Sequence, residues 1–269
     1  LTMEWAYLAF MIPQAIIAVT LVTAAFPSIS RSAADDDHAE ALARYSRTNR
    51  MLAVPMMLCT AVFIALSGPI MWVIGGGTGE TAARANGTVL VAYMLGLVPF
   101  ASLYLIKRVF YAYEDARTPF IAQIPIAALT VVSVPIILTL VDPMYAAMAS
   151  AGAMSLGNLV AWLVGMVQLR RHAARHETLP PSARVGLSLF GRLGVAAAGS
   201  WAVGTGLVLL AGDLLWRHRL LAVLLGAAIA AVMTVVFTAL AHLLRVPEVQ
   251  RLVGTTRRKL ERLTRRTRA

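Results

Sequence analysis

The stretch K-R-V-F-Y-A-Y-E-D-A-R-T-P, residues Lys107–Pro119, decides how this chain is interpreted. It places five charged side chains between two runs that contain none, Ala85–Ile106 and Thr118–Val141. Each run is longer than the ~20 apolar residues that a helix needs to cross ~30 Å of hydrocarbon. We therefore interpret Lys107–Pro119 as a hinge that leaves the membrane and re-enters it. We expect the Thr118 hydroxyl to cap the second helix, with Pro119 in its first turn.

The composition agrees with a membrane location. Hydrophobic residues make up 59% of the 269 residues and charged residues only 14%, whereas a soluble domain carries about 25% charged residues. The fold class is therefore an all-α integral membrane protein, because a helix satisfies its own backbone in lipid. Seven charge-free runs are long enough to span: Trp5–Ser30, Met51–Ile74, Ala85–Ile106, Thr118–Val141, Pro143–Leu169, Leu193–Gly212 and Leu220–Leu244.

The order of these runs suggests a division of the chain. We expect residues 1–171 to form a bundle of five spans, followed by a cytoplasmic connection over 172–192 with a joint at Pro180–Pro181. Residues 193–244 then supply two peripheral spans, and 245–269 form a basic tail. The glycine cluster Gly75–Gly79 lacks the Gly-Lys-Ser/Thr ending of a phosphate-binding loop and is interpreted as a turn.

The basic residues set the predicted topology. Because seven spans alternate sides, 21 of the 24 Lys and Arg fall on the side of the hinge and three on the other. The positive-inside rule places the hinge, residues 31–50 and the C-terminus in the cytoplasm. Asp35–Asp37 precede the arginines within 31–50, which complements a helix dipole and predicts a short cytoplasmic helix there.

The basic tail has two interpretations. Leu252, Val253, Leu260 and Leu263 lie at roughly helical spacing among arginines, which favours a helix on the anionic inner leaflet. The alternative is a solvated basic linker. No nucleic-acid-reading motif accompanies these charges, so nucleic acid is not an expected partner.

No enzyme constellation is present in the sequence. Cys59 is the single cysteine and lies in an apolar run, so we interpret it as an inert thiol. His172 and His176 are four residues apart, a spacing that can place two imidazoles on one helix face. No helix-borne carboxylate accompanies them, so we interpret them as ordinary loop residues and His38 as isolated. We expect no catalytic residue, no metal and no cofactor.

Transport is the remaining class of function. Polar residues and prolines inside spans mark candidate cavity positions: Pro13, Gln14, Pro27, Gln123 and Asn158. Proline frees backbone groups, and transporters keep such interruptions where helices line a cavity. The alternative for each residue is packing between helices, including the small-residue face around Gly152 and Gly157.

The hinge supplies the second group of candidates: Arg108, Asp115, Arg117, Thr118 and Pro119. One interpretation is a gate element in which Asp115 and Arg117 pair locally or with another lobe. The alternative is a well-capped turn whose charges keep the connection inside, with an exposed pair contributing at most about 1 kcal/mol.

The hinge also carries a family resemblance. R-V-F-Y-A-Y-E-D-A-R-T-P, Arg108–Pro119, resembles the R-G-F-Y-A-x-x-D-T-R-T-P signature of the lipid II flippases, the MurJ/MviN family. Pro13 and A-A-F-P-S-I-S, Ala24–Ser30, are similar to the first span of that family's second lobe. L-S-G-P-I, Leu66–Ile70, and the L-x-N ending at Asn158 follow in order. The resemblance covers most of the chain up to residue 171.

The resemblance implies a two-lobe transporter with a further pair of helices. Such a protein moves the undecaprenyl-linked peptidoglycan precursor lipid II to the outer leaflet of the cytoplasmic membrane by alternating access, coupled to membrane potential or an ion gradient. This chain looks like the second lobe and the extra pair, with an N-terminal lobe as its missing partner. Actinobacterial relatives carry further domains after the basic tail, and we expect an actinobacterial origin.

One departure affects substrate binding. Several members carry a cavity-facing arginine where this chain has Tyr7–Ile12, a segment without charge. A pyrophosphate requires cationic partners, so these would come from the missing lobe. Two alternatives stay open. One is another lipid-linked polysaccharide exporter or a drug/cation antiporter of the same superfamily, the latter requiring an acidic residue inside a span. The other is a non-transporting scaffold that recruits cell-wall enzymes.

Overall fold

The computed structural model describes residues 2–75, 79–178 and 183–250, and all regular structure within them is helical. The elements are α1 (Thr2–Pro13), the π-helix η1 (Gln14–Ala18), α2 (Val19–Ala34), α3 (His38–Ala65), α4 (Ser67–Ile74), α5 (Glu80–Met94), α6 (Leu97–Ala112), α7 (Arg117–Leu140), α8 (Pro143–Arg175), α9 (Ala183–Ala211), α10 (Leu214–Arg217) and α11 (Arg219–Leu243). Within these ranges six helices are long and apolar enough to cross a membrane, or seven if the bent pair α5–α6 counts as one span. The predicted all-α fold and number of spans are confirmed.

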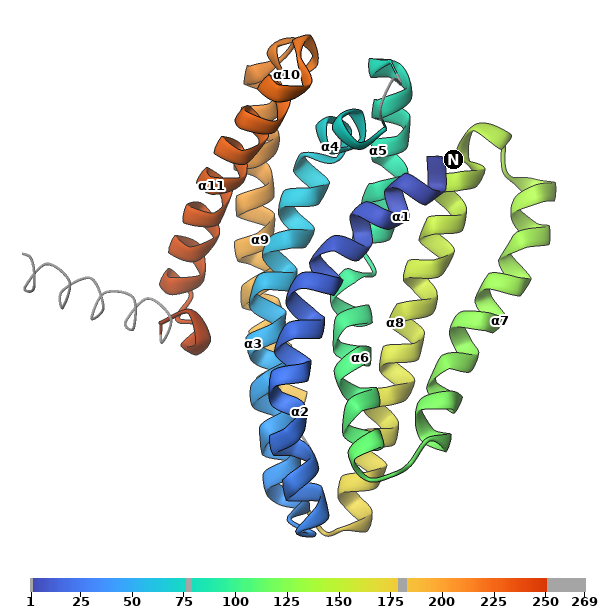
Figure 1. Ribbon diagram of the computed structural model, residues 1–269, viewed down its shortest axis with the longest axis vertical. Helices are drawn as coiled ribbons and strands as arrows, with labels where there is room; N and C mark the ends of the chain where they lie inside the picture. The colour runs from blue at the N-terminus through green and yellow to red at the C-terminus, as the bar shows by residue number, and fades with distance from the viewer. Residues whose placement is uncertain (1, 76–78, 179–182, 251–269) are drawn as a thin grey trace, which may run out of the picture.

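The helices form a central bundle with two flanks (Figure 1). The largest core joins α1–α3, α5, α6 and α8, and includes the fully buried Phe10, Tyr45, Leu90 and Leu105. A separate core joins α9 and α11 to α3 around Leu193, one of its fully buried residues. On the opposite edge, α7 packs mainly against α8 (Figure 1). The bundle therefore has an edge formed by the last two long helices and an edge formed by α7.

The arginine-rich connections and the arginine-poor connections lie at opposite ends of the bundle. The turn between α2 and α3, the hinge between α6 and α7, and the end of α8 lie together at one end (Figure 1). Helices α4 and α10 and the turn between α7 and α8 lie at the other (Figure 1). The alternation that separates arginine-rich from arginine-poor connections in the sequence therefore also separates them in space.

Two expected spans are interrupted before a proline. Pro99 has no N–H for the Leu95 carbonyl, and α5 and α6 meet at an angle of 41° at this point. In the same way Pro69 cannot pair with the Ala65 carbonyl, and α3 ends at Ala65. The expected spans Ala85–Ile106 and Met51–Ile74 are thus each made of two helices.

A serine from α8 compensates for the break between α5 and α6. The buried Ser155 hydroxyl donates to the carbonyls of Ala92 (2.6 Å) and Tyr93 (3.2 Å). A broken helix survives inside a membrane only where a neighbour satisfies the freed backbone groups. Ser155 therefore stabilises the bend between α5 and α6, although it lies on a different helix.

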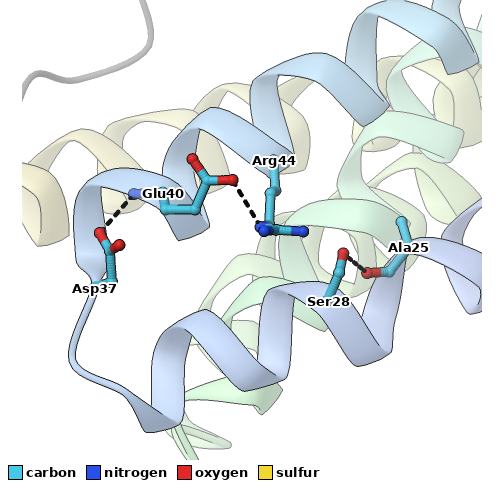
Figure 2. A network of polar contacts seen from close by, with 5 residues as sticks. All are labelled: Ala25, Ser28, Asp37, Glu40 and Arg44. Carbon is cyan, nitrogen blue, oxygen red and sulfur yellow. Dashed lines mark hydrogen bonds and ion pairs between the residues drawn. The ribbon is translucent and has the colours of Figure 1, made fainter.

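The prediction of a helix within 31–50 is correct for residues 38–50, but the prediction that it is short is wrong, because it is the first part of a longer helix. No glycine or proline interrupts residues 38–54, so α3 runs from His38 through the arginines into the apolar segment. Asp37 caps it by accepting a hydrogen bond from the Glu40 N–H at 2.9 Å, and Glu40 pairs with Arg44 at 2.9 Å (Figure 2). The acidic start that the sequence indicated thus caps a 28-residue helix.

The other expected segments are either shorter than predicted or lie outside the described residues. Helix α8 continues to Arg175 and α9 starts at Ala183, so both extend into the expected connection 172–192. The joint at Pro180–Pro181, the central residues of the glycine turn and the tail from residue 251 lie outside the described residues.

Candidate functional site

The hinge caps two helices: it ends α6 and it begins α7. Glu114 has a positive φ of 56°, a left-handed conformation that commonly ends a helix, and the Asp115 N–H returns to the Phe110 carbonyl at 3.0 Å. The Asp115 carboxylate then accepts hydrogen bonds from the N–H groups of Arg117 (2.9 Å) and Thr118 (3.0 Å). These bonds satisfy donors at the start of α7 that have no partner within the helix.

The prediction that the Thr118 hydroxyl caps α7 is wrong. That hydroxyl donates to the second carboxylate oxygen of Asp115 at 2.5 Å, so Asp115 is the capping residue. Burial alone would raise the pKa of Asp115, but the hydrogen bonds from Thr118 and from the Arg117 N–H outweigh it and lower the pKa. The carboxylate is therefore ionised at neutral pH, and Pro119 lies buried in the first turn as expected.

Two cations brace the hinge against neighbouring helices. Half-buried Arg108 donates to the Tyr104 hydroxyl at 2.9 Å, and its guanidinium lies 5.7 Å from the ring centre of Phe26 on α2. Lys107 donates to the Gln123 amide oxygen on α7. The end of α6 is thereby attached to both α2 and α7, while the Arg117 side chain is exposed.

The candidate cavity residues separate into buried and exposed positions. Gln14 follows buried Pro13, opens the π-helix η1, and is 4% exposed; its amide oxygen has no hydrogen-bond partner among the described residues. Asn158 on α8 is 1% exposed, and neither of its amide atoms has a partner in that same part of the chain. Pro27 and Gln123 are exposed. Its hydrogen bond to Lys107 thus joins Gln123 to the hinge, whereas Gln14 and Asn158 are separate buried amides.

The family comparison decides the class of protein. A family model described as Lipid II flippase MurJ matches residues 1–195, which is most of the chain. The chain belongs to the MurJ family of lipid II flippases. It is accordingly a multi-pass membrane protein of a transporter family, and the hinge, the π-helix and the bend between α5 and α6 all lie within the MurJ match.

Two relatives give the extent of the likeness. The chain is 33% identical over 110 residues to a probable lipid II flippase MurJ from Synechocystis sp., covering 40% of this chain and 21% of the relative. A solved lipid II flippase MurJ in an inward-closed conformation matches with a TM-score of 0.64 at 18% identity, over 88% of this chain and 47% of that one. This structural likeness shows the fold, and the chain spans about half the length of the solved MurJ. The expected actinobacterial origin has no support from these relatives.

Two features of this MurJ chain were not predicted from its sequence. Ser155 gave no signal because its partners are backbone carbonyls 62 and 63 residues earlier. The interpretation of His38 as isolated is wrong, since it lies with His172 and His176 at the hinge end of the bundle. The spacing of His172 and His176 was the available signal, but the third imidazole comes from a distant part of the chain.

Proposed function

We propose that this chain is the second lobe and the adjoining helix pair of a transporter that flips lipid II across the cytoplasmic membrane. The observation that carries the proposal is the MurJ match over residues 1–195. In this proposal the arginine-rich end of the bundle faces the cytoplasm. An N-terminal lobe completes the cavity and supplies the arginines that the Tyr7–Ile12 segment lacks.

Interrupted helices support a transport role. The π-helix at Gln14 and the bend before Pro99 leave backbone groups that must be satisfied inside the membrane. Transporters concentrate such interruptions where helices line the substrate path. The Asn158 amide, which has no hydrogen-bond partner among the residues that the structure describes, adds a polar group whose burial costs about 1–3 kcal/mol unless water or a ligand binds it. We propose that Gln14 and Asn158, which are buried in this arrangement of the helices, come to line the path of the lipid II headgroup in another state of the alternating-access cycle.

The buried amide provides the first test. In the full-length protein, we expect Asn158→Leu to reduce flipping about ten-fold or more while the thermal midpoint stays constant or rises, because an unsatisfied polar group is removed. The measurement is the fraction of lipid II reachable by a membrane-impermeant reagent after depletion of the native flippase, alongside thermal unfolding of the purified variant. Thr130→Val is the matched control, since the Thr130 hydroxyl is exposed and donates to the Ile126 carbonyl of its own helix.

The result for Asn158→Leu separates the alternatives. Full flipping with Asn158→Leu would show that the amide only packs between helices. Loss of flipping together with loss of folded protein would assign it a structural role instead. If depletion of the whole protein leaves lipid II export unchanged but displaces cell-wall enzymes, the scaffold function replaces the transport function.

We also propose that the hinge is a cytoplasmic gate. The Arg117 backbone N–H bonds Asp115, while the exposed guanidinium has no hydrogen bond or ion pair within the described part of the chain and can therefore meet the other lobe. Arg117→Ala should therefore insert with normal topology, reported by a cysteine-labelling probe near Tyr113, while flipping falls several-fold. Arg219→Ala, at the opposite end, is the charge-matched control. Unchanged flipping by Arg117→Ala would show that the hinge is a capped turn without a gating role.

A further inference from the structure

Three histidines converge at the hinge end of the bundle. His38 is the first residue of α3, His172 lies in the last turn of α8, and His176 directly follows α8. One ring nitrogen from each lies within 4.8 Å of the others. The ring centres are 3.7 Å apart for His38 and His176, and 4.6 Å for His172 and His176. His38 is thus brought into one cluster with two histidines that lie 134 and 138 positions further along the chain.

Two features of these imidazoles suit them to act as ligands. The Nε2 atom of His172 is buried and has no hydrogen-bond partner among the described residues, so its ligand position is unused. His38 Nδ1 lies 3.2 Å from the Tyr113 hydroxyl of the hinge. In the tautomer in which Nδ1–H donates to Tyr113, the His38 Nε2 carries the free lone pair that a metal requires. Such an outer hydrogen bond is the usual means of fixing the orientation of a metal-binding histidine.

We propose that His38, His172 and His176 bind one divalent transition metal of the zinc class. Neutral imidazoles suit Zn²⁺, Co²⁺, Ni²⁺ and Cu²⁺, whereas Mg²⁺ and Ca²⁺ require oxygen ligands. Ligands at about 2.0–2.1 Å from a tetrahedral Zn²⁺ are roughly 3.3 Å apart, so the three nitrogens must move closer together, and the facing rings of His38 and His176 must turn so that their lone pairs converge. The exposed His176 side chain supplies this adjustment, because it lies beyond the last helical residue. Three imidazoles leave a fourth position open for water.

The surrounding charges permit a cation at this site. The Asp115 carboxylate is close enough to His172 to interact with it electrostatically, which opposes the repulsion from nearby Arg175. The bound metal would join the start of α3 to the end of α8 beside Tyr113. It would therefore hold three connections at the hinge end in one arrangement. This inference rests on side-chain geometry and is independent of the proposed lipid II transport.

Metal binding by the purified chain tests the site. The protein should carry an affinity tag without histidine, be stripped with a chelator in detergent, and then be titrated with Zn²⁺ or Co²⁺. We expect one metal per chain by elemental analysis, a visible Co²⁺ spectrum typical of nitrogen ligands, and a thermal midpoint that rises with Zn²⁺ concentration. His176→Ala should weaken binding by more than about 100-fold, and Tyr113→Phe by about 10-fold through loss of the outer hydrogen bond.

His176 is chosen because it is exposed, so its replacement should leave folding intact; the thermal midpoint in chelator checks this. His38→Gln is the second variant and should also abolish the Co²⁺ spectrum. His242→Ala, an exposed histidine on α11, is the matched control and should bind metal like the wild type. The inference is overturned if the wild-type chain binds no stoichiometric metal, or if His176→Ala and His38→Gln bind as tightly as His242→Ala. In either case the three rings are a metal-free stack.

Discussion

Replacing Phe10 by alanine is expected to lower the stability of the helical bundle by about 3 kcal/mol. Phe10 on α1 is completely buried, and its ring centre lies 5.7 Å from that of Tyr93 and 5.5 Å from that of Phe100. The substitution leaves a cavity where α1 meets α5 and α6. In soluble proteins a Phe→Ala cavity costs about 3–5 kcal/mol. We use the lower end of that range because lipid is as apolar as the interior, so lost packing dominates.

The thermal midpoint of the purified chain in detergent measures this effect. A loss of about 3 kcal/mol corresponds to a midpoint lower by roughly 6–12 °C. Phe120→Ala removes the same side chain from a position that is 70% exposed on α7, and should change stability by less than about 0.5 kcal/mol. Equal shifts for the two variants would contradict the assignment of Phe10 to the core.

Gly96→Ala is expected to lower the free energy of unfolding by about 2–4 kcal/mol, because the added methyl group prevents the close approach of the α5–α6 bend to α8. A Cβ atom there would lie 2.8 Å from the Ser155 Cα and 2.7 Å from its hydroxyl oxygen. A backbone atom cannot move aside without displacing α8, and such overpacking costs about 1–3 kcal/mol. Displacing Ser155 also leaves the Ala92 carbonyl without the hydrogen bond that it accepts at 2.6 Å.

Gly152→Ala supplies the control for Gly96→Ala. A Cβ atom at Gly152, in the interior of α8, has no described heavy atom within 4 Å. The higher helix propensity of alanine should therefore increase stability by up to about 1 kcal/mol. Thermal unfolding of both variants and the wild type checks the pair. A wild-type midpoint for Gly96→Ala would mean that the contact between the bend and α8 is loose.

The sequence predicted local features well. Hydropathy summed over one window is enough to identify a helix that can cross a membrane, so the number of spans was confirmed. The acidic residues before α3 and the prolines before the helix breaks also act on neighbouring backbone groups. Even here the choice of cap was wrong: Thr118 and Asp115 are both suitable, and only the turn at Glu114 brings the Asp115 carboxylate to the first N–H groups of α7.

By itself, then, the sequence determined membrane embedding, the alternation of basic and neutral connections, and the hinge motif by which the family was recognised. These properties depend on residue type and on neighbours within one helix or turn. Tertiary structure alone decided that Ser155 completes a bend 63 residues away, that His38 meets Tyr113 across 75 residues, and that Asn158 is buried with no hydrogen-bond partner in the described ranges. Such contacts arise from which helix faces pack together. In a uniformly apolar membrane helix, hydropathy does not distinguish one face from another.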